Sequence, residues 1–324
     1  LTSQGGSSEI RANHVQFSPN QAFAIDMGSL TLDAPLQQLG NGGISITADA
    51  ITFPDTIETR GGPIILTARY GGITAFFDND SSPAILRTRA AADSGQASGA
   101  ILLDAENAND NGFISVGSLD AAGANHATGA GSHGGDITLK SDGGITYTAL
   151  SVGGGDGSGA SGGNSGDILL QTDDNAGLSL PTVPLRALGG SGSTAGSDGI
   201  ITLEARGNGG ITQPADGAEI QAERLNLASH TIGSPLTNLT GEIALVDADN
   251  KVDVLGVNTF KGTADATGQT LRFVNQGDLT LKGWRSSGFY AEGPLEIDVG
   301  SGHLTLDAAI QSPVGGLTAT GGNF

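Results

Sequence analysis

Short apolar–polar alternations recur along the chain at a nearly constant spacing. The strings DITL, DILL and GIITL place apolar side chains two residues apart around Ile137, Ile168 and Ile201, and these isoleucines are 31 and 33 residues apart. Alternate side chains of a strand point to opposite faces of a sheet. Each string therefore predicts a short strand with one buried row and one exposed row.

A second string follows each first one, as GIT at 144–146, GLS at 177–179 and GIT at 210–212, with a spacing of 33 residues each time. A third apolar segment comes next, for example at 149–152. The intervals between strands vary too much for a series of tight hairpins. A unit of about three strands that returns with a period in the thirties predicts a parallel β-helix, in which each strand stacks on its equivalent one turn later.

The predicted β-helix is all-β and takes up residues 1–324 as a single body, with about 30 residues per turn. We interpret the sequence as a segment of a longer chain. Three sub-regions are expected: less regular turns at 1–100, turns with glycine-rich insertions at 101–212, and compact regular turns at 213–324. Four side chains represent the expected inward row: Leu170, Ile201, Leu281 and Ile297.

Three glycine-rich runs, at 121–135, 153–166 and 187–199, follow the third strand of successive units. The middle run has eight glycines in 14 residues and no large apolar side chain. Glycine gives such a run a large chain entropy and nothing apolar to offset its ordering. We therefore expect the runs to project from one edge of the β-helix as free loops. The alternative is an ordered ledge, in which the runs bond from turn to turn.

Two segments have partly helical propensity but are flanked by strand strings. We expect residues 84–92 to form a strand and a corner. Residues 220–227 fit a strand–turn–strand arrangement better than a helical period of 3.6.

Charge narrows the choice of partners. The chain has 14 Lys and Arg against 34 Asp and Glu, a net charge of −20, and no cysteine. Such a surface repels nucleic acid and anionic membranes, which leaves cations, neutral glycans and proteins. The absence of cysteine excludes a disulfide scaffold. No apolar stretch of about 18 residues occurs, so no transmembrane segment is expected.

Candidate metal ligands are few. Asp247, Asp249 and Asp253 lie in one acidic string, but the glycine and the distal glutamate of an EF-hand loop are missing. The pattern favours an acidic turn, with calcium near these three residues as the alternative. Acidic strings at 78–80 and 173–175 also indicate turns. No pair among the five histidines has metal-ligand spacing, and no catalytic or cofactor-binding residue is predicted.

One aromatic cluster is the candidate ligand-contact site. Trp284 and Tyr290, with Phe289 and the neighbouring Arg285, lie between two strand strings. Aromatic faces beside a guanidinium can stack on a sugar or dock a protein. The alternative is a corner of the β-helix that packs its own aromatic side chains.

The C-terminal strings resemble a known family. GDLTL at 277–281, GHLTLDAAI at 302–310 and GLTA at 316–319 are similar to repeats of filamentous haemagglutinin-like adhesins of Gram-negative bacteria. The resemblance implies a right-handed parallel β-helix. It also implies export by two-partner secretion, with an outer-membrane secretion partner, and action as an adhesin at the cell surface or in the matrix. The secretion-recognition domain found at the N-terminus of that family is not evident in residues 1–324.

Two classes of function are compatible with these patterns. The first is an extracellular structural adhesin or scaffold, a stiff rod whose surfaces attach to a polysaccharide or protein receptor on another cell or in a biofilm matrix. The second is a β-helical polysaccharide lyase or hydrolase, which shares the fold class, so the fold alone does not decide. Such a lyase needs carboxylates and a basic residue on one face, and the sequence indicates no such local set. A passive spacer or surface-layer element is a further alternative.

Overall fold

The computed structural model is all-β, without a helix among the residues that it describes. The described strands fall into two compact units. Unit 1 comprises Leu1–Ile168 with Ala187–Gly199, and unit 2 comprises Leu169–Arg186 with Ile200–Phe324. The structure describes the chain except for residues 1–7, 11–14, 18–22, 27–29, 33–35, 39–40, 54, 76–83, 107–110, 174–176, 207–208, 230–241, 260–269, 285–288, 292, 312–314 and 323–324.

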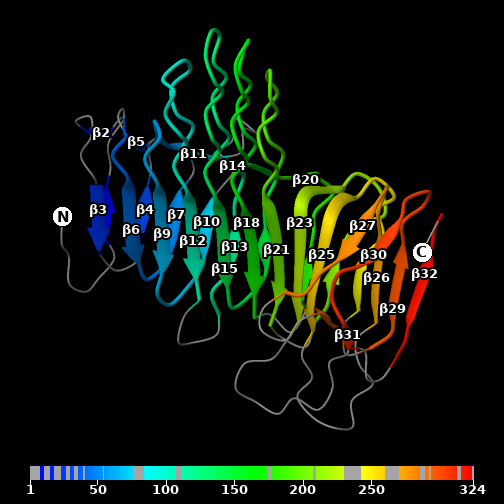
Figure 1. Ribbon diagram of the computed structural model, residues 1–324. Helices are drawn as coiled ribbons and strands as arrows, with labels where there is room; N and C mark the ends of the chain where they lie inside the picture. The colour runs from blue at the N-terminus through cyan, green and yellow to red at the C-terminus, as the bar shows by residue number, and fades with distance from the viewer. Residues whose placement is uncertain are drawn as a thin grey trace. The chain divides into compact units, whose positions relative to one another are not determined.

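Unit 1 has three parallel sheets, and each turn of the chain contributes one strand to each sheet (Figure 1). Sheet 1 consists of β1 (Ser8–Ile10), β4 (Leu30–Leu32), β7 (Ile51–Phe53), β10 (Ile73–Ala75), β13 (Ile114–Ser115) and β16 (Ile145–Thr146). Sheet 2 consists of β2 (Val15–Phe17), β5 (Leu36–Gln38), β8 (Ile57–Thr59), β11 (Ile85–Arg87), β14 (Ser118–Asp120) and β17 (Ala149–Ser151). Sheet 3 contains β3 (Phe23–Asp26), β6 (Ile44–Ala48), β9 (Ile64–Ala68), β12 (Ile101–Ala105) and β15 (Ile137–Ser141).

Unit 2 begins within β18 (Ile168–Thr172) and has two sheets. Sheet 4 consists of β19 (Leu178–Ser179), β22 (Ile211–Thr212), β24 (Ile243–Leu245), β26 (Leu271–Val274), β29 (Leu295–Asp298) and β32 (Leu317–Thr320). Sheet 5 contains β21 (Ile200–Ala205), β23 (Ile220–Ser229), β25 (Lys251–Thr259), β27 (Leu279–Leu281) and β30 (Leu304–Leu306). Three shorter strands extend sheet 5: β20 (Leu185–Arg186) on β23, and β28 (Phe289–Tyr290) between β25 and β31 (Ile310–Gln311). The predicted parallel β-helix is confirmed.

The length of a turn varies along the chain. Leu30 is the partner of Ile51 in sheet 1, and Ile51 is the partner of Ile73, so these two turns are shorter than expected. Ile101 and Ile137, which are partners in sheet 3, lie much further apart in the sequence. The middle turns are longer because segments are inserted between their strands, whereas the C-terminal turns are short again, with Leu271 aligned to Leu295 and Leu295 to Leu317. The figure of about 30 residues per turn is therefore an average that few turns match.

The predicted inward row is confirmed. Leu170, Ile201 and Leu281 have no exposed surface, and Ile297 is 2% exposed. Strands such as β6 and β9 alternate between buried and half-buried positions along their whole length. Each fully buried aliphatic side chain contributes about 1.5–3 kcal/mol relative to an exposed one. Burial of this kind requires stacked neighbours, which is why the repeat folds only as a series.

Residues 84–92 include β11, which confirms the expected strand. The strand–turn–strand prediction for residues 220–227 is wrong, because β23 is one continuous strand of ten residues. Ile220 aligns with Leu185 of β20, and Leu225 aligns with Ile201 of β21. The chain between β20 and β21 carries the run 187–199, and β23 has no such insertion. Without it, the two short strands become one long strand.

Candidate functional site: a glycine-rich ledge and its surroundings

Four inserted arms make up the most distinctive surface of unit 1. We define them as the first arm (88–100), second arm (121–135), third arm (153–166) and fourth arm (187–199), and together as the ledge. The first three follow strands β11, β14 and β17 of sheet 2. Figure 1 shows the arms, coloured cyan to light green, rising beyond the same end of the strands. The predicted projection from one edge is confirmed, and the structure adds residues 88–100 as another arm.

Backbone hydrogen bonds join each arm to the next. The amide of Ser98 donates to the carbonyl of His133 over 3.0 Å, linking the first and second arms. Gly131 donates to Ser161 over 2.9 Å, and Gly162 donates to Thr194 over 2.8 Å. The outgoing and returning legs of one arm are also bonded. Three bonds of this kind are Ser132 to Ala124, Gly163 to Gly155 and Gly196 to Gly190, at 2.8–3.0 Å. The prediction of free loops is therefore wrong, and the ordered ledge is correct.

Glycine is required because neighbouring backbones lie too close for a side chain. A Cβ added to Gly131 would lie 1.8 Å from the carbonyl oxygen of Gly155. A Cβ added to Gly163 would lie 1.9 Å from that of Ser132. Real Cβ atoms essentially never approach closer than 3.0 Å. As at the crowded axis of collagen, absence of a side chain allows backbones to pack directly against one another.

Polar side chains tie the arms together in two rows. In the first row, Asn125 Oδ1 accepts the amide of Asp156 at 2.8 Å, and Asp156 Oδ1 accepts the amide of Ser191 at 2.8 Å. The second row uses the returning legs, where His133 Nδ1 accepts the amide of Asn164 at 2.8 Å and Asn164 Oδ1 accepts that of Ser197 at 3.0 Å. These side chains stand one turn apart in the sequence. Each satisfies an amide that the next arm would otherwise leave to water.

A depression of about 420 Å³ lies across all four arms. Its polar lining includes Asp93, Asn125, His126, Asp156 and Ser191. His126 Nδ1 lies 3.4 Å from Asp93 Oδ1. The depression presents carboxylate, amide and hydroxyl groups on a fixed backbone, and such groups suit hydrogen bonding to a polar ligand.

The Asp156–Ser191 contact gives a testable prediction. Hydrogen bonds from the Ser191 hydroxyl, at 2.7 Å, and from its amide hold the pKa of Asp156 below its usual 3.8. Because the folded pKa is lowered, this contribution to the stability of the ledge is present above the unfolded pKa. It is lost as the pH falls through the folded value. We expect Ser191→Ala to raise the pKa of Asp156, as measured by carboxyl ¹³C NMR titration. An unchanged pKa in Ser191→Ala, or an equal rise in the control Ser158→Ala, would contradict the assignment.

The predicted aromatic cluster is divided between two faces. Phe289 has no exposed surface, whereas Trp284 and Tyr290 are half-buried. Tyr290 pairs with Asn258 of β25, and a Cβ added to Gly256 of the same strand would lie 2.9 Å from the Cβ of Trp284. Phe289 thus packs inward and presents no surface to a ligand. Arg285 lies outside the described residues, and the ligand-contact role of Trp284, Arg285 and Tyr290 stays a prediction.

The acidic string near residue 247 forms a turn. Asp247 is 2% exposed, its Oδ2 accepts the amide of Ala218 at 3.0 Å, and its Oδ1 accepts that of Asp249 at 2.9 Å. Asp249 and Asp253 are exposed. Within the described part of the chain, no group of three or more His, Cys, Asp or Glu side chains is placed to hold a metal ion. The string at 78–80 lies outside the described residues, as does most of 173–175.

Next to this turn lies a buried amide pair that the sequence did not indicate. Gln213 Nε2 donates to Asn250 Oδ1 at 2.7 Å, and Asn250 Nδ2 donates to Gln213 Oε1 at 3.0 Å. Asn250 Oδ1 also accepts the amide of Ile220 at 2.8 Å. The two residues are 37 positions apart, and both side chains are satisfied. We assign them a structural role in unit 2.

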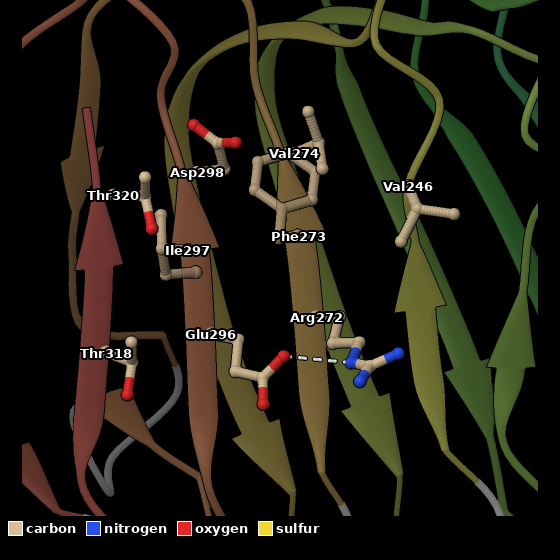
Figure 2. A pocket seen from close by; sticks show the side chains of 9 residues that line it. All are labelled: Val246, Arg272, Phe273, Val274, Glu296, Ile297, Asp298, Thr318 and Thr320. Carbon is tan, nitrogen blue, oxygen red and sulfur yellow. Dashed lines mark hydrogen bonds and ion pairs between the residues drawn. The ribbon is translucent and has the colours of Figure 1, made fainter.

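A groove of about 300 Å³ lies on the outer face of sheet 4 in unit 2 (Figure 2). Arg272 Nε bonds Glu296 at 2.9 Å and lies 3.2 Å from Glu242. The half-buried Val246 and Val274 supply apolar parts of its lining. The guanidinium is balanced by two carboxylates, which makes this groove a weaker candidate for a charged ligand than the ledge is for a polar one.

The structure also brings together a mixed charged set in unit 1. Three arginines and two carboxylates line an open pocket of about 440 Å³ beside the start of the first arm: Arg60, Arg87, Arg89, Glu58 and Asp120. The expectation that no local basic and acidic set exists is wrong for these residues. They come from three successive turns of unequal length, which concealed their proximity in the sequence.

Comparison with known protein families, curated proteins and solved structures finds no match to this chain. Among the described residues, no helix is long and apolar enough to cross a membrane.

Proposed function

We propose that the chain is an adhesive scaffold at the surface of a bacterial cell, and that the ledge is its contact surface. The ordered ledge is the observation that carries this proposal. Its arms hold few large apolar side chains, so ordering them, at roughly 1–2 kcal/mol per residue, must be offset by bonds between arms. A rigid polar surface built in this way is preorganised for recognition, which lowers the entropy cost of binding.

Further support comes from where the arms lie. Insertions on one face are the usual way in which repeat proteins carry a binding surface, and rigid scaffolds commonly present functional loops. The net charge of −20 favours neutral glycans or proteins over nucleic acid as partners. The resemblance to filamentous haemagglutinin-like repeats adds the expectation of an extracellular location and an outer-membrane secretion partner.

A second candidate function is favoured by the charged pocket. Glu58 and Asp120 lie in one pocket with three arginines, and a polysaccharide lyase or hydrolase needs carboxylates and a basic group on one face. An enzyme of this class would turn over uronate polymers, whereas an adhesive scaffold binds without turnover.

The adhesive role is tested with the whole chain coupled to fluorescent beads. We expect the beads to bind bacterial cells or polysaccharide films, and we expect a variant with charged arm tips to bind several-fold less. That variant is Thr128→Glu, Ser158→Glu and Ser193→Glu, three exposed side chains on three different arms. An unchanged melting temperature would show that the tips alone were altered. Equal binding of both proteins would exclude the ledge as the contact surface, and no binding by either would favour a passive spacer.

The enzymatic alternative is tested in parallel on uronate polymers, with and without calcium. We expect neither new reducing ends nor unsaturated products. Turnover that Glu58→Gln or Asp120→Asn abolishes would overturn the adhesive proposal in favour of an enzyme.

A further inference from the structure

The charged pocket is built on three neighbouring strands of sheet 2. Glu58 of β8, Arg87 of β11 and Asp120 of β14 are aligned partners across these strands. Two residues beyond this row, Arg60 and Arg89 line the same pocket. Neighbouring strands are about 4.8 Å apart, so the charged groups form a compact array rather than scattered surface charges.

One carboxylate holds two of the guanidinium groups in place. Asp120 Oδ1 lies 3.0 Å from Arg89 Nη2, and Asp120 Oδ2 lies 3.4 Å from Arg87 Nε. The Asp120 side chain is only 17% exposed, against 38% and 45% for the two arginines. This arrangement fixes both guanidinium planes while leaving part of each open to the pocket, so a ligand need not order them.

Two charges in the pocket are left unmatched. Among the described residues, the side chains of Arg60 and Glu58 have no hydrogen-bond or ion-pair partner. Arg60 and Arg89 follow the ends of the neighbouring strands β8 and β11 and line the same pocket. Like charges placed side by side across neighbouring strands are destabilising. The pocket thus has a local charge of +1 in a chain whose net charge is −20. An anion bound between Arg60 and Arg89 would remove the repulsion.

We infer that this pocket binds a glycan containing uronic acid, with one sugar carboxylate between Arg60 and Arg89 and a sugar hydroxyl donating to Glu58. Guanidinium groups hold carboxylates through paired, charge-assisted hydrogen bonds. A uronate ring carries its hydroxyls and its carboxylate together, which matches a pocket that offers both a carboxylate acceptor and guanidinium donors. This inference goes beyond the adhesive role of the arm tips, because the pocket lies at the base of the first arm and shares no residue with the depression across the four arms.

The same lining disfavours ligands that carry more negative charges, and it disfavours peptides. A sulfated glycan or an acidic peptide would bring additional negative charges against Glu58, Asp120 and the acidic surface. The residues that complete the pocket, Ala90 and Ala91, are small, so no large apolar side chain is present to accept one from a peptide. A volume of about 440 Å³ lies within the usual range of small-ligand sites, roughly 300–1,000 Å³.

The test is isothermal titration of the whole chain with a trimer of galacturonic acid. We expect binding that weakens with added salt, and about a tenfold or greater loss of affinity in Arg60→Ala, the size of effect given by one charged hydrogen bond. Lys251→Ala removes the same charge from an exposed position outside the pocket and should bind as the parent does. The fully methyl-esterified trimer, which lacks the carboxylates, should bind at least tenfold more weakly than the free acid.

Further probes separate the ligand classes. A sulfated tetrasaccharide and tetraglutamate should each bind more weakly than the uronate trimer, and Glu58→Gln should shift the preference toward the sulfated compound. The inference is overturned if the parent does not bind the trimer, if Arg60→Ala binds it as tightly as the parent, or if the ester, the sulfated compound or the peptide binds as well. Loss of uronate binding in Arg60→Ala with retained bead adhesion would separate the function of this pocket from that of the arm tips.

Discussion

Replacing Leu281 with aspartate is expected to lower the melting temperature of the chain by about 10 °C or more. Leu281 lies on β27 with no exposed surface, aligned with the equally buried Leu255 of β25. A carboxylate at this position would lack a partner in an apolar core, and burial without one costs several kcal/mol. Thermal unfolding followed by circular dichroism measures the effect.

The neighbouring residue supplies the matched control. Thr280 is half-buried on the outer side of the same strand, so Thr280→Asp keeps its charge in contact with water. We expect a change of only a few degrees. If the melting temperature fell by the same amount in both variants, the division of β27 into an inner and an outer face would be wrong.

Strand positions were predictable because their cause is local. An alternating string such as GDLTL at 277–281 determines which side chains share a face, whatever lies above or below. The length of each turn was not predictable to the same degree. Insertions add residues between strands without altering the strand strings. A period measured at Ile137, Ile168 and Ile201 therefore does not apply to the shorter turns that join Leu30 to Ile73.

The ledge shows where reasoning from composition fails. Glycine permits a flexible chain and permits close backbone packing, and the residues 153–166 alone do not distinguish the two. Packing depends on whether the arms above and below have matching lengths and glycines at facing positions. Gly131 and Gly155 face each other across two arms, yet no apolar signal in the sequence links them. The spacing of 31 between Asn125 and Asp156, and between His133 and Asn164, was the available indication of registered arms.

The candidate sites also differ in how readily the sequence reveals them. Trp284 and Tyr290 are conspicuous because aromatic residues are scarce, at 4% of the chain. The charged pocket was hidden because Arg60, Arg87 and Asp120 meet only once the register of β8, β11 and β14 is known. Long-range register depends on every intervening turn length, and irregular insertions remove that information from the sequence pattern.

Substituting alanine for Gly163 should destabilise the ledge by about 3 kcal/mol or more, because overpacking forces the backbone to move. The added Cβ would lie 1.9 Å from the carbonyl oxygen of Ser132 in the second arm. Gly163 also accepts the amide of Gly190, at 2.8 Å, from the fourth arm. Displacing this residue therefore disturbs both neighbouring arms. In this variant, hydrogen exchange should be faster at the amides of position 163 and of Gly190 than in the parent, and the melting temperature should be lower.

The sign of this change discriminates between an ordered ledge and free loops. In a free loop, Gly163→Ala would be neutral or would stabilise the chain by about 0.4–1 kcal/mol, because alanine reduces the entropy of the unfolded chain. Gly316→Ala provides the control, since a Cβ there meets no atom within 4 Å and its φ is not positive. We expect Gly316→Ala to leave the melting temperature within a degree or two of the parent. If Gly163→Ala behaved in the same way, the hydrogen bonds between the second, third and fourth arms would not contribute to folding, and the ledge could not act as a rigid contact surface.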